Sequence, residues 1–110
     1  MNSIKFNDEL TRTLSQIAEL LDKKGDEYSI ENNVFSNFEK AANIQNLYRE
    51  EIMFNYSMKH FVSIIDMIQS LRGVKYTKTT LPDKDVINEK FNDMIAYLII
   101  MKSSLLDRHR

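Results

Sequence analysis

The fold is decided by the stretch Tyr56–Ile68, which reads YSMKHFVSIIDMI. In and beside this stretch, bulky apolar residues recur at steps of four, three, four and three; they are Phe54, Met58, Phe61, Ile65 and Ile68. This spacing follows one face of an α-helix, because 3.6 residues make one turn. The stretch therefore predicts a long helix whose apolar stripe is buried.

A second stripe on the same predicted helix is polar. Lys59, Ser63 and Asp66 recur at steps of four and three, and His60 lies at the edge of this stripe. The row has two interpretations. It is either a solvated helix face with one Lys/Asp contact, or a site for a phosphorylated ligand or a metal ion. The residues alone leave both interpretations open.

The rest of the chain predicts long helices and few turns, because it contains two glycines and one proline. We expect helices at about residues 7–24, from Ser36 onward, at about 46–71 and at about 83–106. Gly25 has the position of a helix C-cap, Ser36–Glu39 has the spacing of a capping box, and Pro82 suits a first helical turn. No strand pattern of sufficient length is present. The predicted fold is all-α, a compact bundle of about four helices in a single domain, 1–110.

The last predicted helix is apolar beyond one face. One stripe consists of Phe91, Met94, Leu98, Met101 and Leu105, and it is widened by Ile95, Ile99, Ile100 and Leu106. A helix that is apolar around most of its circumference is covered around most of it. Four helices cannot readily enclose one of their own number, so we expect a homo-oligomer that associates through this helix.

Composition limits the class of protein. The net charge of −1 gives no bulk basic field, so we expect neither bulk nucleic-acid binding nor attachment to a membrane surface. The longest apolar run, Met94–Met101, is too short to span a bilayer, and the first residues lack the apolar run of a signal peptide. The absence of cysteine excludes thiolate nucleophiles and cysteine zinc sites. We therefore expect a cytoplasmic protein, and no motif assigns a catalytic residue.

Three carboxylates form a candidate metal site. Glu89 and Asp93, four residues apart, share one face of the last predicted helix, and Asp66 comes from the preceding one. Three carboxylates are suitable oxygen ligands for Mg²⁺, which is the possible cofactor. The alternative is that Glu89 and Asp93 are surface acids near a helix N-terminus, where the helix dipole favours negative charge.

Four segments in order resemble one protein family. They are KKGDEYS at 23–29, FSNF at 35–38, KHFVSIIDM at 59–67 and EKFNDMIAYL at 89–98. The set resembles the nucleotide-modification-associated domain family of small phage and prophage proteins, over roughly residues 10–105. The resemblance implies a compact α-helical fold, a phage context with a location in the host cytoplasm, and a connection to nucleotides.

A more distant resemblance is to the all-α nucleoside triphosphate pyrophosphatases of the MazG type. Those enzymes hold Mg²⁺ with a Glu-Glu-x-x-Glu helix and a Glu-x-x-Asp helix. Glu89 and Asp93 match the second motif in part, since they are four residues apart. The only adjacent glutamates, Glu50 and Glu51, are followed by Phe54, where that motif has a carboxylate.

Two functions follow as hypotheses. The first is a nucleotide-binding protein, such as one that sequesters a nucleotide-derived signal of host defence. Lys24 and Lys59 would neutralise phosphate, and His60 and Ser63 would donate hydrogen bonds. Tyr28, Phe38 or Tyr97 could stack on a base with their aromatic rings, and Asn37 is a further predicted ligand-binding residue. The second function is an Mg²⁺-dependent nucleotide hydrolase in which Asp66, Glu89 and Asp93 hold the metal. The shortage of carboxylates favours binding, and a helical scaffold without a small ligand is the third interpretation.

Overall fold

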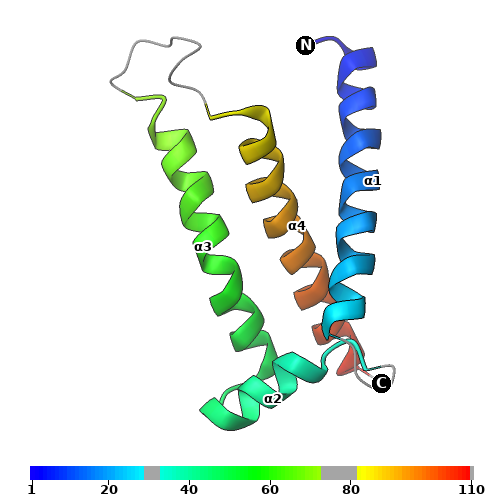
Figure 1. Ribbon diagram of the computed structural model, residues 1–110, viewed down its shortest axis with the longest axis vertical. Helices are drawn as coiled ribbons and strands as arrows, with labels where there is room; N and C mark the ends of the chain where they lie inside the picture. Colours follow the sequence, from blue (N-terminus) through cyan, green and yellow to red (C-terminus); the bar gives the residue numbers. More distant parts are fainter. Residues whose placement is uncertain (29–32, 73–81, 110) are drawn as a thin grey trace.

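The computed structural model describes residues 1–28, 33–72 and 82–109, with side chains left undescribed at 26–28. These residues form four helices and no strand, which confirms the predicted all-α bundle (Figure 1). The helices are α1 (Ser3–Tyr28), α2 (Ser36–Gln45), α3 (Arg49–Gln69) and α4 (Lys84–Asp107). None of the described helices is long and apolar enough to cross a membrane.

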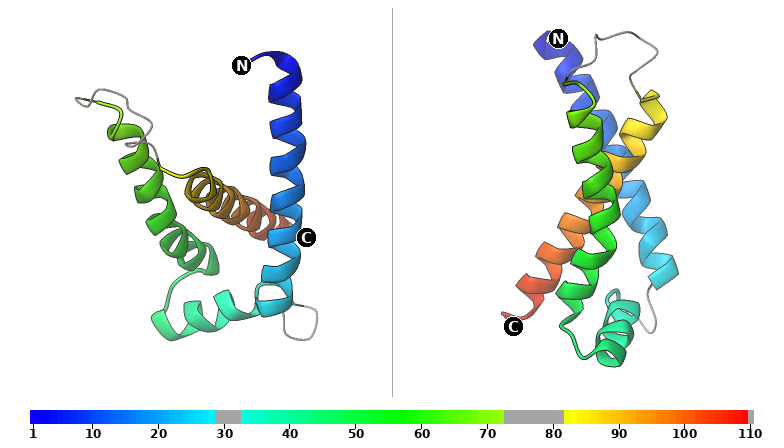
Figure 2. Two further views of the ribbon diagram at one scale, coloured as in Figure 1. Left: turned by 45° about the horizontal axis from the view of Figure 1, so that its top comes forward. Right: turned by 90° about the vertical axis from the view of Figure 1, so that its left-hand side faces the viewer.

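Helix α4 is the centre of the arrangement. The three long helices lie side by side in the order α3, α4, α1, and the short α2 crosses one end of this layer (Figures 1 and 2). Helix α4 packs against both α3 and α1, and α2 packs against α3. The first turns of α1 bury little of their apolar surface, since Ile4 and Phe6 are 71% and 58% exposed.

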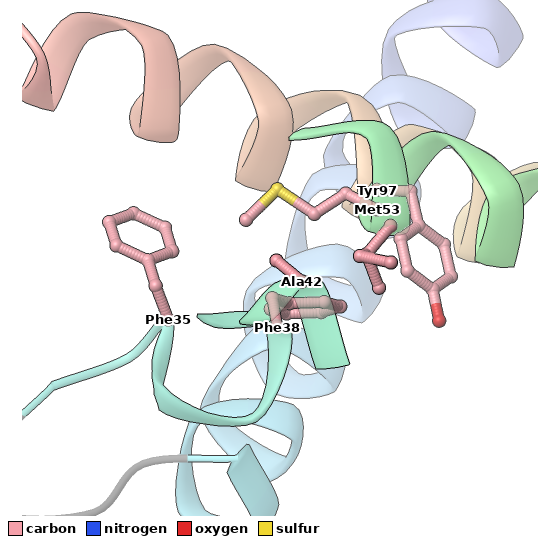
Figure 3. Close-up of a cluster of buried hydrophobic side chains, with 6 residues drawn as sticks. Phe35, Phe38, Ala42, Met53 and Tyr97 are labelled. Atoms are coloured by element: carbon pink, nitrogen blue, oxygen red, sulfur yellow. The ribbon is translucent and has the colours of Figure 1, made fainter. Parts of the chain in front are cut away.

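The buried apolar core lies at the end of the layer that α2 covers. Figure 3 shows Phe38 and Ala42 of α2, and Phe35 just before it, facing Met53 of α3 and Tyr97 of α4. Ile52 of α3 completes this core cluster. Burial of these apolar side chains is the main favourable contribution to folding, and it is concentrated at one end of the molecule.

The stripe that the sequence predicted to be buried on α3 is exposed. Phe61 is 44% and Ile68 is 56% exposed, and Phe54 and Met58 are exposed as well. The face that α3 turns toward its neighbours consists instead of Ile52, Met53, Ser57, His60 and Ile64. The prediction of the buried face is therefore wrong for the single chain, because α4 and α2 cover a neighbouring face that includes two polar side chains.

Large apolar side chains of the other two long helices are also exposed. Leu14 is 58%, Phe91 38% and Leu98 51% exposed, whereas Ile65 and Met94 are half-buried. Leu14 lies on an exposed face of α1, and Phe91 and Leu98 lie on a face of α4 that no other described helix covers. Apolar periodicity identified these faces correctly as apolar but could not tell which of them the chain covers itself.

Two predicted helix boundaries are corrected at glycine and asparagine. Helix α1 continues through Gly25 to Tyr28, so Gly25 is not a C-cap. Helix α3 begins at Arg49 and not at 46, because Asn46 adopts a left-handed conformation with φ 55° that ends α2. The first turn of α3 is held by Glu51, whose carboxylate accepts a hydrogen bond of 3.0 Å from the N–H of Tyr48.

Two predicted helix starts are close to the observed positions, but the residues at the first turns do not make the capping contacts that were expected. Helix α2 begins at Ser36, yet the Ser36 hydroxyl donates to the carbonyl of Asn33 and no side-chain capping bond forms. Pro82 precedes the N-cap, Asp83, and so lies just before the first turn of α4. Within the predicted connectors, residues 29–32 and 73–81 lie outside the described residues.

Replacing Gly25 with alanine should stabilise the protein by about 0.5–1 kcal/mol. Gly25 is helical, and nothing lies within 4 Å of the position that a Cβ atom would take. Alanine would therefore reduce the entropy of the unfolded chain without a clash. The reverse substitution at an exposed position of the same helix, Ala18→Gly, should destabilise by a similar amount. Urea denaturation measures both, and a lower midpoint for Gly25→Ala would contradict the continuous helix.

Candidate functional site

His60 is buried where α3 meets α4, and two more side chains connect it to α1. The imidazole stacks on the ring of Tyr97 with 5.9 Å between centroids. On α1, the ammonium group of Lys24 lies 5.2 Å from the centroid of the Tyr97 ring. Asp93, one turn before Tyr97 on α4, places its carboxylate 3.6 Å from Nδ1 of His60. We call Lys24, His60, Asp93 and Tyr97 the junction cluster.

The Nδ1 atom of His60 is buried and has no hydrogen-bond partner among the described residues. Its distance of 3.6 Å from Asp93 is too long for a hydrogen bond. A buried polar atom without a partner costs about 1–3 kcal/mol, and most such atoms in folded proteins are satisfied. An imidazole left in this state is therefore a candidate for contact with a ligand.

Electrostatics favour a neutral imidazole at this position. Burial lowers the pKa of His60 below its usual value of 6.5, and the Asp93 carboxylate opposes this change. Three ammonium groups lower the pKa further, those of Lys59, Lys90 and Lys24. These lysines come from α3, α4 and α1, respectively. The junction cluster therefore has lysines from three helices in its vicinity, one of which, Lys90, is paired with Glu89 at 3.9 Å.

The structure brings together four of the residues predicted to bind a ligand. Lys24, His60 and Tyr97 belong to the junction cluster, and Lys59 is exposed beside it. Ser63 follows one turn after Lys59, and its hydroxyl donates a 2.8 Å hydrogen bond to the Lys59 carbonyl. This internal bond occupies the proton that Ser63 was expected to donate to a ligand.

Three other predicted ligand-binding residues are not part of this cluster. Phe38 is 1% exposed inside the core, with its ring centroid 6.0 Å from that of Tyr56, and it lines part of a small cavity that Lys24 also lines. Asn37 is exposed on α2. The side chain of Tyr28 lies outside the described residues.

The three carboxylates of the predicted metal site lie in two different grooves. Asp66 lines a groove of about 460 Å³ between the end of α3 and the start of α4, together with Ser63 and Lys90. Glu89 and Asp93 line a groove of about 560 Å³ between α4 and α1. Among the described residues, no three His, Asp or Glu side chains are close enough to hold a metal ion. The fold separates the set because Glu89 turns toward α1 and Asp66 does not.

Sequence reasoning missed a second polar cluster, centred on Arg49. Its guanidinium group binds Glu39 of α2 at 2.9 Å and, on α4, Asp107 at 3.2 Å and the hydroxyl of Ser104 at 2.6 Å. It also lies 4.4 Å from the centroid of the Phe35 ring. This one side chain connects α2, α3 and the end of α4. Its partners are up to 58 residues away, so the chain offers no local pattern that reveals it; the adjacent serines 103 and 104 in the apolar α4 are the one hint.

The neighbouring Glu50 extends this second cluster to the C-terminal residues. Burial acts to raise the pKa of Glu50, but hydrogen bonds from Arg108, Ser104 and Arg49 hold it below its usual value of 4.5. The Nε atom of Arg108 lies 2.6 Å from the Glu50 carboxylate. Because the charges are paired with one another, this cluster has the character of a structural connection between helices.

Comparison with known proteins identifies no relative. No protein-family model matches the chain, and neither a curated protein nor a solved structure matches it. The resemblance of the four sequence segments to a phage family therefore stays a prediction.

Replacing Arg49 with lysine should destabilise the protein by about 1.5–3 kcal/mol, although the charge is kept. A single ammonium group cannot reach Glu39, Ser104 and Asp107 at once, and it leaves buried acceptors on α4 unpaired. Arg12→Lys is the matched control, because Arg12 binds only Glu9 on an exposed face of α1. Denaturation in urea should separate the two variants. Equal midpoints would show that the Arg49 contacts do not stabilise the fold.

The lowered pKa of His60 predicts that stability decreases at acidic pH. The unfolded chain takes up a proton near pH 6.5, whereas the folded chain resists it until a lower pH. Stability is therefore complete above pH 6.5 and falls as the pH decreases toward the folded-state pKa. The His60→Gln variant should lack this contribution to the loss of stability at acidic pH. The His109→Gln variant, which is changed at an exposed position, should retain it. Urea midpoints between pH 7.5 and 5.5 test this; identical profiles for His60→Gln and the wild type would contradict it.

Proposed function

We propose that the protein binds a phosphorylated small molecule, a nucleotide or a nucleotide-derived signal, at the junction cluster. The observation that supports the proposal is the buried Nδ1 of His60, which has no hydrogen-bond partner among the described residues, together with lysines from three helices, Lys24, Lys59 and Lys90, that lie near enough to lower the pKa of this imidazole. Ammonium groups and an imidazole are the side chains that stabilise phosphate oxygens by charge-assisted hydrogen bonds. A ligand of this class would give the Nδ1 atom a hydrogen-bond partner.

His60 is suited to respond to an anion. Without a ligand it is held neutral by burial and by the lysines. A bound phosphate group nearby favours the charged form and would raise the pKa of His60, so that both ring nitrogens become donors. The imidazole would then add a positive charge that is present only in the complex.

The space beside Lys24 suits the apolar part of such a ligand. Lys24 lines a cavity of about 170 Å³ whose other walls are largely apolar, including Leu21, Val34 and Ile99. Ligand sites commonly combine an apolar wall with a few polar groups. Tyr97 does not serve as the stacking platform expected from the sequence, because it is 5% exposed between His60 and Lys24. Its role in this proposal is to hold those two side chains in place.

Binding is favoured over hydrolysis by the position of the acids. An Mg²⁺-dependent hydrolase would need Asp66 to act with Glu89 and Asp93, and these residues line two different grooves. Sequestration of a nucleotide-derived signal, the role hypothesised for a binding protein, requires only binding.

Lys59→Ala should weaken nucleotide binding about 10- to 150-fold, which corresponds to the 1.5–3 kcal/mol of a charge-assisted hydrogen bond. Calorimetric titration with inorganic phosphate, mononucleotides, triphosphates and cyclic dinucleotides, each with Mg²⁺ and with EDTA, measures the effect. Lys40→Ala, an exposed lysine on α2, is the control that should keep wild-type affinity.

The same titrations distinguish the alternative function. Asp66→Asn should leave affinity nearly unchanged in a binding protein, since the anion contacts are cationic. Appearance of products that requires Mg²⁺ and is abolished in Asp66→Asn would instead establish a hydrolase. Unaltered affinity of Lys59→Ala for every ligand that the wild type binds would refute the site.

A further inference from the structure

The single chain exposes more surface than a self-sufficient domain of its size. Its accessible surface is 8470 Å², whereas a folded monomer of 13.0 kDa exposes about 6,300 Å². The radius of gyration is 16.8 Å, compared with about 13 Å for a compact domain of this length. The excess of roughly 2,100 Å² is large relative to the surface that one partner contributes to a typical interface.

The open surface follows from the arrangement of the helices. Domains bury their apolar faces by stacking two layers of secondary structure. Here α3, α4 and α1 form one layer, and the short α2 covers only one end of it (Figures 1 and 2). The face of the layer away from α2 has no covering element among the described residues.

Apolar side chains of α3 and α4 point to that uncovered face. Phe61 follows Ile52 by nine residues, and Phe91 precedes Ile100 by nine residues. Nine residues make about two and a half helical turns, so each phenylalanine points away from its isoleucine. Ile52 belongs to the core cluster beside α2, and Ile100 packs against this cluster. Phe61 and Phe91 therefore lie on the opposite side of the layer.

Each of these phenylalanines belongs to a row with a spacing of seven residues. The rows are Phe54, Phe61 and Ile68 on α3, and Phe91, Leu98 and Leu105 on α4, and we call these six residues the outer face. Each of them is between 38% and 56% exposed. A sustained spacing of seven is the pattern by which helices pack against other helices with interlocking side chains.

We propose that the outer face is the interface of a symmetric dimer, in which the α3–α4 pair of a second copy forms the missing layer. A two-fold interface brings the same patch of both copies together, so it must be self-complementary, and two uncharged heptad rows meet this condition. Four helices packed through such rows make a standard four-helix core. An obligate dimer buries about 1,000–2,500 Å² per chain, which matches the excess surface. A membrane surface is a poorer occupant, because the net charge of the chain is −1.

This dimer leaves the proposed ligand site open. Lys59 precedes Phe61 by two residues, which is about 200° around the helix, so its side chain projects away from the outer face. Dimer formation and phosphate binding are therefore tested by different variants, and failure of one does not decide the other.

The first test is the mass in solution, measured by size-exclusion chromatography with light scattering at tens of micromolar protein. We expect twice the chain mass of 13.0 kDa for the wild type. Leu98→Glu should reduce the mass to that of one chain. Ile44→Glu is the control, since Ile44 is 85% exposed on α2, outside the outer face, and this variant should remain a dimer. A wild-type mass of one chain, or a dimer that survives Leu98→Glu, would overturn the proposal.

A second measurement covers the case in which Leu98→Glu fails to fold. The chain has no cysteine, so a single introduced thiol reports local exposure. The thiol of Leu98→Cys should react with a maleimide roughly tenfold more slowly in native protein than in urea, because the interface covers it. The thiol of Ile44→Cys should react at similar rates in both. Equal native rates at the two positions would overturn the proposal, as would vesicle binding by a chain that remains monomeric.

Discussion

The structure depends on α4 packing against α3 and α1 at the same time. A helix in the middle of a row uses both flanks for its neighbours and a third side for the core beneath α2. What remains of its circumference is the outer face, and that face is apolar. The apolar width of α4 is thus explained partly by the two helices of its own chain and partly by a surface that these helices leave open.

The same packing buries polar groups between helices, which costs free energy unless the groups form hydrogen bonds. His60 faces Tyr97 and Asp93 because α3 turns that side toward α4, while Phe61, one residue later, faces outward. A chain selected only for the stability of a monomer would have buried the phenylalanine and exposed the imidazole. Both the exposed phenylalanine and the buried imidazole are explained if the outer face packs against a second copy and the junction cluster binds an anion.

The two polar clusters illustrate the difference between a structural and a binding arrangement of charge. Around Arg49 and Glu50, each buried charge has opposite charges within hydrogen-bond distance, and the cluster holds three helices together. Around His60, the Asp93 carboxylate lies 3.6 Å from Nδ1, and this buried nitrogen has no hydrogen-bond partner among the described residues. The charges of the first cluster are satisfied by one another, whereas the second cluster contains a buried polar atom that a ligand could satisfy.

The sequence by itself determined the all-α class and the approximate positions of the four helices, because apolar periodicity and the scarcity of glycine and proline are local properties. It also placed Lys59 and His60 correctly as neighbours on one helix. Only the tertiary structure decided which apolar stripe is covered, since Phe61 and Ile64 are equally apolar and the choice depends on the angle at which α4 arrives. Tertiary packing likewise separated Asp66 from Glu89 and brought Arg49 to Ser104. Such pairings depend on contacts between distant parts of the chain, and the periodicity of one helix carries no information about the orientation of its neighbour.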